Sequence, residues 1–152
     1  MNEMRTPIFR RNNDLEEMLT TLNGLLESVE GNAIQSIPQT NKEHPLIFIM
    51  GPLRSGTTLL MQWLSSLGFI AYPTNILSRF YGAPVVGAHI QLMLTDTQYN
   101  FRDEILDFNG QISFNSENGK TKGALAPNEF WYFWRRFLPS DEIVGLSDDE
   151  MR

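Results

Sequence analysis

Cysteine is absent from this sequence of 152 residues. Its absence excludes a disulfide framework, a thiol nucleophile and any zinc site that uses cysteine ligands. It leaves the cellular compartment open, because a cytosolic protein needs no cysteine. Histidine is scarce too, with two residues, and we find no carboxylate cluster suited to Mg²⁺. We therefore expect no metal site.

Long hydrophobic runs are also missing. The longest uninterrupted apolar stretch has five residues, Leu46 to Met50, whereas a membrane-spanning helix needs about 20. The first 14 residues are polar and contain no apolar segment of the kind found in a secretory signal peptide. The sequence therefore predicts a cytoplasmic protein with no transmembrane segment.

Positive charge is in deficit, with 12 Lys and Arg against 18 Asp and Glu, a net charge of −6. Such a chain is a poor general binder of nucleic acid or of anionic membranes, so no nucleic-acid partner is expected. An anion site would have to be local and built from a few donors. The chain is not short of core-forming residues, because 41% are hydrophobic and 10 Phe, 4 Tyr and 3 Trp are present. Its length suits one ordinary domain.

Residues 13–30 have the pattern of an amphipathic helix, with Asn13 as its cap, Glu16 at the capping-box position and Gly31 at its end. The apolar residues at helical spacing are Leu15, Met18, Leu19, Leu22, Leu25, Leu26 and Val29. The helix is expected to pack beside the core or, alternatively, to be a dimerisation or partner helix, through which a homo-oligomer could form. The polar residues 31–45 indicate a linker. We therefore divide the chain into an N-terminal helix with its linker, residues 1–44, and a domain over residues 45–152.

The pattern of residues 45–152 predicts an α/β fold with a parallel sheet flanked by helices. Leu46 to Met50 is typical of a strand buried on both faces, and residues 57–67 of a helix. A short strand over 69–72 and helical segments within 76–108 are expected to follow. The segment 109–126 is rich in Gly, Asn and Ser and contains a predicted turn at Asn118-Gly119. An aromatic helix is expected over 130–138, where Pro139 ends it.

The loop between the first strand and its helix is the most informative segment. A glycine-containing turn that leads into a helix collects backbone N–H groups at the positive end of the helix dipole, which suits a phosphate or sulfate. Gly51 and Gly56 are spaced as in the P-loop pattern G-x-x-x-x-G-K-[ST], but Thr57 stands where that pattern has lysine. The single cation of the loop is Arg54. Hydrolysis of ATP or GTP would therefore lack an essential charge.

The run Pro52-Leu-Arg-Ser-Gly-Thr-Thr-Leu-Leu60 resembles the 5′-phosphosulfate-binding loop of sulfotransferases that use 3′-phosphoadenosine 5′-phosphosulfate (PAPS). Those enzymes carry a basic residue and then Ser-Gly-Thr-Thr after the first strand of a P-loop-like α/β domain, of the class of the P-loop-containing nucleotide hydrolases. Leu53 departs from the family pattern, which often has proline directly before the basic residue. The resemblance implies transfer of a sulfuryl group from PAPS, without a metal, to a hydroxyl or amine of a small-molecule or carbohydrate acceptor. The residues it places on the donor are Arg54, Ser55, Gly56, Thr57 and Thr58.

The resemblance to sulfotransferases implies a catalytic role for Arg54, which would neutralise charge on the leaving phosphate. The candidates for the general base are Glu129 and His89. Glu129 precedes the aromatic helix, although an acid in a first helical turn, beside Asn128 as cap, also suits the dipole. His89 lies in an apolar stretch and is alternatively a core residue. In tyrosylprotein-type sulfotransferases the base is a Glu soon after the loop helix, but residues 72–76 contain no acid.

Three weaker features complete the candidate sites. Lys120 and Lys122 could reach an anionic acceptor, although exposed turns often carry lysine. The aromatic side chains of residues 130–137 could stack on a ring or form core. Arg135 and Arg136 suit the end of a helix in any case.

Sulfotransferases of this type also bind the donor 3′-phosphate through an Arg and a Ser after a later strand, and the sequence beyond Arg136 offers no such pattern. We expect the chain to be the N-terminal portion of a larger enzyme. Two other readings stay open. One is a nucleotide kinase or NTPase with a degenerate Walker A loop, and the other is a non-catalytic anion-binding or interaction module.

Overall fold

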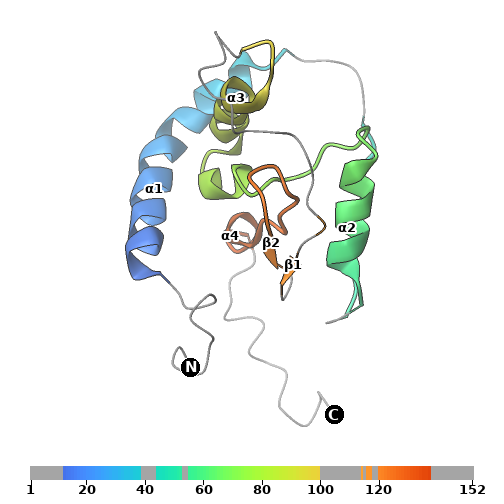
Figure 1. Cartoon of the computed structure of the whole chain (residues 1–152). Helices are drawn as coiled ribbons and strands as arrows, with labels where there is room; N and C mark the ends of the chain where they lie inside the picture. Colours follow the sequence, from blue (N-terminus) through green and yellow to red (C-terminus); the bar gives the residue numbers. More distant parts are fainter. Residues whose placement is uncertain are drawn as a thin grey trace.

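A computed structural model describes residues 12–38, 44–52, 55–99, 114, 116–117 and 120–137. Its elements, in chain order, are α1 (Asn13–Ser36), α2 (Thr57–Ser66), the 3₁₀-helix η2 (Leu77–Phe80), α3 (Pro84–Thr95), β1 (Ser116–Glu117), β2 (Lys120–Thr121) and α4 (Trp131–Trp134). Figure 1 shows α1 and α2 on opposite sides, with η2, α4 and the β1–β2 pair between them. The predicted turn at Asn118-Gly119 and residue Leu138 lie outside the described residues.

The predicted α/β fold with a parallel sheet is wrong. Within the described ranges the β structure is one antiparallel pair, in which Ser116 faces Thr121 and Glu117 faces Lys120, and helices predominate. The predicted strand Leu46–Met50 is irregular and solvent-exposed, with 83% of Leu46 and 88% of Met50 accessible. A strand requires a hydrogen-bonding neighbour, and a short apolar run does not reveal whether one exists.

The second predicted strand, over residues 69–72, is also not formed. Instead, the chain just after it makes an isolated antiparallel bridge between Thr74 and Pro127. Hydrogen bonds from Asn128 N to Pro73 O (2.8 Å) and from Asn75 N to Ala126 O (3.0 Å) reinforce it. Two loops are thus joined without a sheet.

The predicted N-terminal helix is confirmed, but it is longer and begins with a different cap. α1 continues through Gly31 to Ser36, and so takes six residues from the expected linker. The cap is Asn12, whose side-chain Oδ1 accepts from Leu15 N at 3.1 Å, rather than Asn13. A glycine inside a helix costs only about 1 kcal/mol, so tertiary packing can carry the helix past it.

The packed part of the molecule is formed by α1, α3 and η2, with α4 against η2. Its interior is notably polar. The buried apolar side chains of the described residues are Leu19, Ala83, Ala126, Pro127 and Phe130, and they are outnumbered by buried polar ones. Two of the polar residues, Asn23 and Glu30, lie on the inner face of α1. Because buried polar groups must be hydrogen-bonded, these two positions decide how the helices fit together.

Glu30 fills the role of a missing helix cap. α3 begins at Pro84 after Ala83, which makes no side-chain capping bond. The carboxylate of Glu30 accepts instead from Val85 N at 2.8 Å and from Val86 N at 3.2 Å. A negative charge at this end of α3 also favours the helix dipole. One side chain of α1 therefore satisfies the first free N–H groups of α3.

We expect Glu30→Ala to lower the free energy of unfolding by about 2 kcal/mol, because two partly buried N–H groups would lose their acceptor. Glu30→Gln keeps an acceptor and should cost about 1 kcal/mol. Chemical denaturation followed by circular dichroism measures both, with Glu17→Ala on the exposed side of α1 as control. Equal stability of Glu30→Ala and Glu17→Ala would contradict this role of Glu30.

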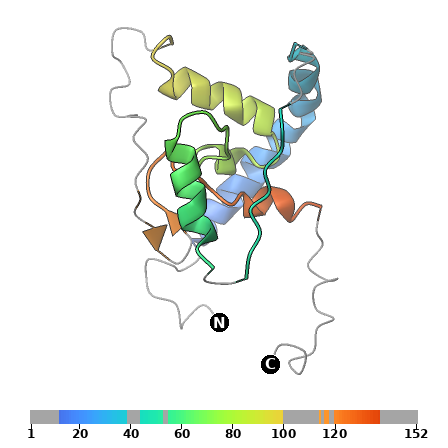
Figure 2. The same cartoon turned by 90° about the vertical axis from the view of Figure 1, so that its right-hand side faces the viewer.

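The second predicted helix, over 57–67, is confirmed as α2. However, the side that is buried is a polar one and not the side that carries the apolar residues. Gln62 is fully buried and Ser65 nearly so, whereas Leu59, Trp63 and Leu67 are exposed. The apolar spacing predicted the helix and not its buried side. Figure 2 shows the chain descending through residues 44–50 and then returning upward as α2.

Candidate anion-binding loop

The loop between residues 50 and 57 turns the chain into the first turn of α2. Ser55 N donates to Pro52 O at 3.2 Å, which closes the turn, and Leu60 N donates to Gly56 O at 3.0 Å, which starts the helix. Leu53 and the predicted donor-binding and catalytic residue Arg54 lie outside the described residues. The other four predicted donor-binding residues are described, and they are consecutive at the start of α2.

Gly56 is the N-cap of α2 and has a φ of +83°. This left-handed conformation is favourable for glycine and strained for other residues. Among the described residues, no side chain makes a capping hydrogen bond to α2, and its first turn contains no acidic residue. Within that part of the chain the N-terminal N–H groups and the positive dipole of the helix have no acidic side chain from its own first turn to compensate them. That arrangement suits a bound oxyanion.

Gly51 is needed for a different reason. A Cβ atom at this position would lie 3.1 Å from the Thr57 methyl group and would collide with the Ser55 side chain. The close approach places Gly51 beside Ser55 and Thr57 at the start of α2. Ser55 and Gly56 are exposed, whereas Thr57 and Thr58 are half-buried. The loop thus offers backbone and hydroxyl donors at an accessible point.

The predicted general base Glu129 is exposed, and its carboxylate accepts a hydrogen bond from the indole Nε1 of Trp131. Asn128, the predicted cap, accepts from Phe130 N at 2.8 Å. Phe130 has a φ of +56°, so helix α4 begins only at Trp131. The prediction of a helix from 130 was therefore wrong at its start, because a left-handed residue cannot continue a right-handed helix.

A polar cluster around Asn75 positions this segment. Its Oδ1 accepts from Asn128 Nδ2 at 2.7 Å, and its Nδ2 donates to Gly123 O at 2.8 Å and to Thr121 Oγ1 at 3.1 Å. Burial raises the pKa of Tyr72, three residues before Asn75 in the sequence. In the sequence, residues 72–76 are marked only by the lack of an acid, and Asn75 was not among the predicted site residues. No local pattern marks an asparagine whose partners lie some 50 residues away.

His89, the second candidate base, is exposed on α3 rather than a core residue. Figures 1 and 2 place α3 at the end of the molecule where α2 finishes, opposite the end where α2 begins. Among the described residues, no hydrogen bond or ion pair joins His89 or Glu129 to residues 55–58. Of the predicted donor residues, the four described ones follow one another at the start of α2, and within the described residues neither candidate base contacts them by a hydrogen bond or ion pair.

The aromatic segment forms core at one end and surface at the other. Phe130 is buried and stacks on Phe133 with ring centroids 4.8 Å apart, while Trp131 and Phe137 are exposed. Arg136 donates to Tyr81 O at 2.9 Å and pairs with Glu27 of α1, so it joins α4 to the helical part. Lys122 is exposed, as expected for a turn lysine.

Comparison with family models, with curated proteins and with solved structures found no match to this chain. Within the described ranges, no helix has the length and apolar character that crossing a bilayer requires. Nor do three or more His, Asp or Glu side chains of those residues gather as metal ligands would.

Proposed function

We propose that residues 54–58 bind the 5′-phosphosulfate of PAPS and that the chain takes part in sulfuryl transfer to a hydroxyl or amine acceptor. The observation that carries the proposal is the start of α2. A left-handed Gly56 leads into an uncapped helix whose first turn has no acid, directly after the only cation of the loop in the sequence, Arg54. The proposal rests on this loop and on its resemblance to the sulfotransferase loop.

The loop chemistry fits a dianionic group better than a neutral one. The N–H groups of residues 57–59 supply fixed partial positive charge, and the hydroxyls of Ser55, Thr57 and Thr58 supply further donors. Arg54 adds a full charge with a geometry suited to tetrahedral oxyanions. These groups would stabilise the charge that develops on the leaving phosphate as the sulfur–oxygen bond to it breaks.

In the proposed reaction the acceptor oxygen or nitrogen forms a bond to sulfur, the bond from sulfur to the phosphate oxygen breaks, and the acceptor proton passes to a base. Glu129 is the first candidate for that base and His89 the second, and both side chains are exposed. His89 lies on α3, away from the start of α2, which favours Glu129. The acceptor class that we propose is a small molecule or carbohydrate.

Isothermal titration of the chain with 3′,5′-diphosphoadenosine, the product form of the donor, tests the proposal. We expect saturable binding that does not require Mg²⁺, because Arg54 and the N–H groups take the place of a metal. ATP with Mg²⁺ serves as the comparison ligand. Binding of ATP only with Mg²⁺, and none of 3′,5′-diphosphoadenosine, would contradict the proposal and favour a nucleotide kinase or NTPase.

A further inference from the structure

Helix α1 carries two apolar faces rather than one. Leu19 and Leu26 lie on the side that bears buried Asn23 and Glu30. A second row follows a strict alternation of three and four residues along the helix and lies beside the first row, on the more exposed flank of α1. The members of this row, called the outer seam here, are Leu15, Met18, Leu22, Leu25 and Val29.

The outer seam is accessible to a partner. Met18 is 66% exposed, Leu25 70% and Val29 45%, while Leu15 and Leu22 are partly exposed. Spacing of three and four residues is the pattern by which one helix packs along another in a coiled coil. Single exposed apolar residues are ordinary, but a periodic row along four turns of one helix is not.

The seam borders a shallow, open depression on the surface of α1. It has a volume of about 430 Å³ and is lined by Asp14, Glu17, Met18, Thr21, Leu22 and Leu25. Four of these, at positions 18, 21, 22 and 25, have the relative spacing of the four residues that surround an inserted side chain in knobs-into-holes packing. The remaining two, Asp14 and Glu17, add negative charge to its rim.

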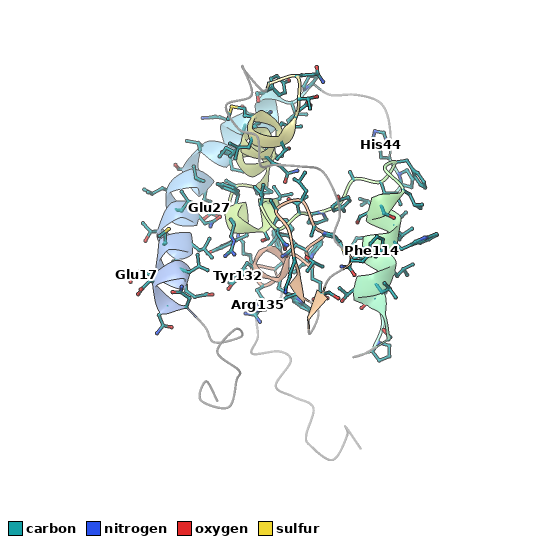
Figure 3. The ribbon with its side chains drawn as sticks, in the orientation of Figure 1. Glu17, Glu27, His44, Phe114, Tyr132 and Arg135 are labelled. Carbon is teal, nitrogen blue, oxygen red and sulfur yellow. The ribbon has the colours of Figure 1, made fainter. Side chains whose placement is uncertain are left out.

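The charge of α1 indicates which kind of helix fits. The helix contains five acidic residues and no basic one. Three of the acids serve the packed part: Glu16 accepts from the Tyr132 hydroxyl, Glu27 pairs with Arg136, and Glu30 caps α3. Asp14 and Glu17 make no hydrogen bond or ion pair within the described residues. Figure 3 shows Glu17 pointing outward and Glu27 pointing inward.

From these observations we infer that the outer seam is a docking site for a basic amphipathic helix of another protein. The partner places apolar side chains, spaced by three and four residues, into the seam, and its Lys or Arg residues lie beside Asp14 and Glu17. A second copy of this chain fits less well, because it brings another acidic helix with no cation to meet them. This inference does not depend on the proposed sulfotransferase function.

The test uses the full chain and two synthetic helical peptides of about three heptads with leucine at the seam spacing. One peptide has lysine and the other glutamate at the flanking positions. Fluorescence anisotropy should show at least tenfold tighter binding of the lysine peptide, with an affinity that falls as salt is raised, because exposed charge pairs are screened. Equal binding of the two peptides, or no binding of either, would overturn the inference.

Variants locate the binding surface. Met18→Lys and Leu25→Lys should each weaken lysine-peptide binding at least tenfold, because they put a cation into the apolar seam. Leu46→Lys, at an exposed apolar position outside α1, should leave it unchanged. Circular dichroism verifies that each variant keeps its helix content. Unaltered binding by both seam variants would place the site elsewhere and overturn the inference.

Charge reversal provides the sharpest outcome. The double variant Asp14→Lys/Glu17→Lys should reverse the preference, so that the glutamate peptide binds more tightly than the lysine peptide. Sedimentation analysis of the unmodified chain tests the competing occupant. A dimer that dissociates in Leu25→Lys would show that a second copy covers the seam, and would refute docking of a basic helix there.

Discussion

Replacing Arg54 by alanine is expected to lower the affinity of the chain for 3′,5′-diphosphoadenosine by about 10- to 100-fold. A hydrogen bond to a charged group contributes about 1.5–3 kcal/mol, and each 1.4 kcal/mol is a factor of ten in affinity. Arg54 is the only cation between Gly51 and Thr58. In a chain of net charge −6, no general positive field replaces it. Isothermal titration measures the change.

Two further variants make the Arg54 result specific. Arg79→Ala removes an exposed arginine from η2 and should leave the affinity unchanged, although it alters net charge equally. Arg54→Lys keeps the charge but loses the planar fork, and it should give an intermediate affinity. If Arg54→Ala and Arg79→Ala weaken binding by the same factor, the effect is one of net charge and Arg54 has no local role.

Asn23→Ala is expected to lower the free energy of unfolding by about 3 kcal/mol, a large loss for a single residue. The Asn23 side chain is buried, with 3% of the residue accessible. Its Nδ2 donates to Leu19 O at 2.7 Å and to Arg79 O at 2.9 Å, and its Oδ1 accepts from Gly82 N at 2.7 Å. Alanine would leave the Arg79 carbonyl and the Gly82 N–H buried without their partner.

Chemical denaturation of Asn23→Ala and of Asn32→Ala measures this effect. Asn32 is an exposed asparagine of the same helix, so its replacement controls for the change in helix propensity. Asn23→Leu should not rescue stability, because it restores volume but no hydrogen bond. Unfolding of Asn23→Ala at the same denaturant concentration as Asn32→Ala would contradict the assigned bridge between α1 and η2.

The sequence predicted helices well where their periodicity extends over several turns, and strands poorly. Residues 13–30 and 57–67 repeat an apolar spacing over several turns, and each does form a helix, α1 and α2. Leu46 to Met50 shows only an apolar run, which fixes neither a partner strand nor a buried environment. The side of α2 that faces inward was likewise unpredictable, because its fully buried residue is polar Gln62.

Part of the candidate site could be derived from local chemistry. The turn at Gly51, the left-handed Gly56 and the helix from Thr57 follow from the glycine spacing and the apolar residues after it. The hydrogen-bonding roles of Asn23, Glu30 and Asn75 depend on partners distant in the sequence. The helix pattern did contain one indication of these roles. Asn23 and Glu30 fall on the same face of the helix as Leu19 and Leu26, and a polar residue on a buried face needs a hydrogen-bond partner.

The most direct test of the central claim is to follow the backbone amide resonances of residues 55–59 by NMR while 3′,5′-diphosphoadenosine is added. If the start of α2 is the anion site, the amides of Ser55, Gly56, Thr57 and Thr58 should shift saturably, and those of α1 and α3 should not. Saturable shifts centred on another element, or no shifts at residues 55–58, would show that the loop does not bind the donor nucleotide.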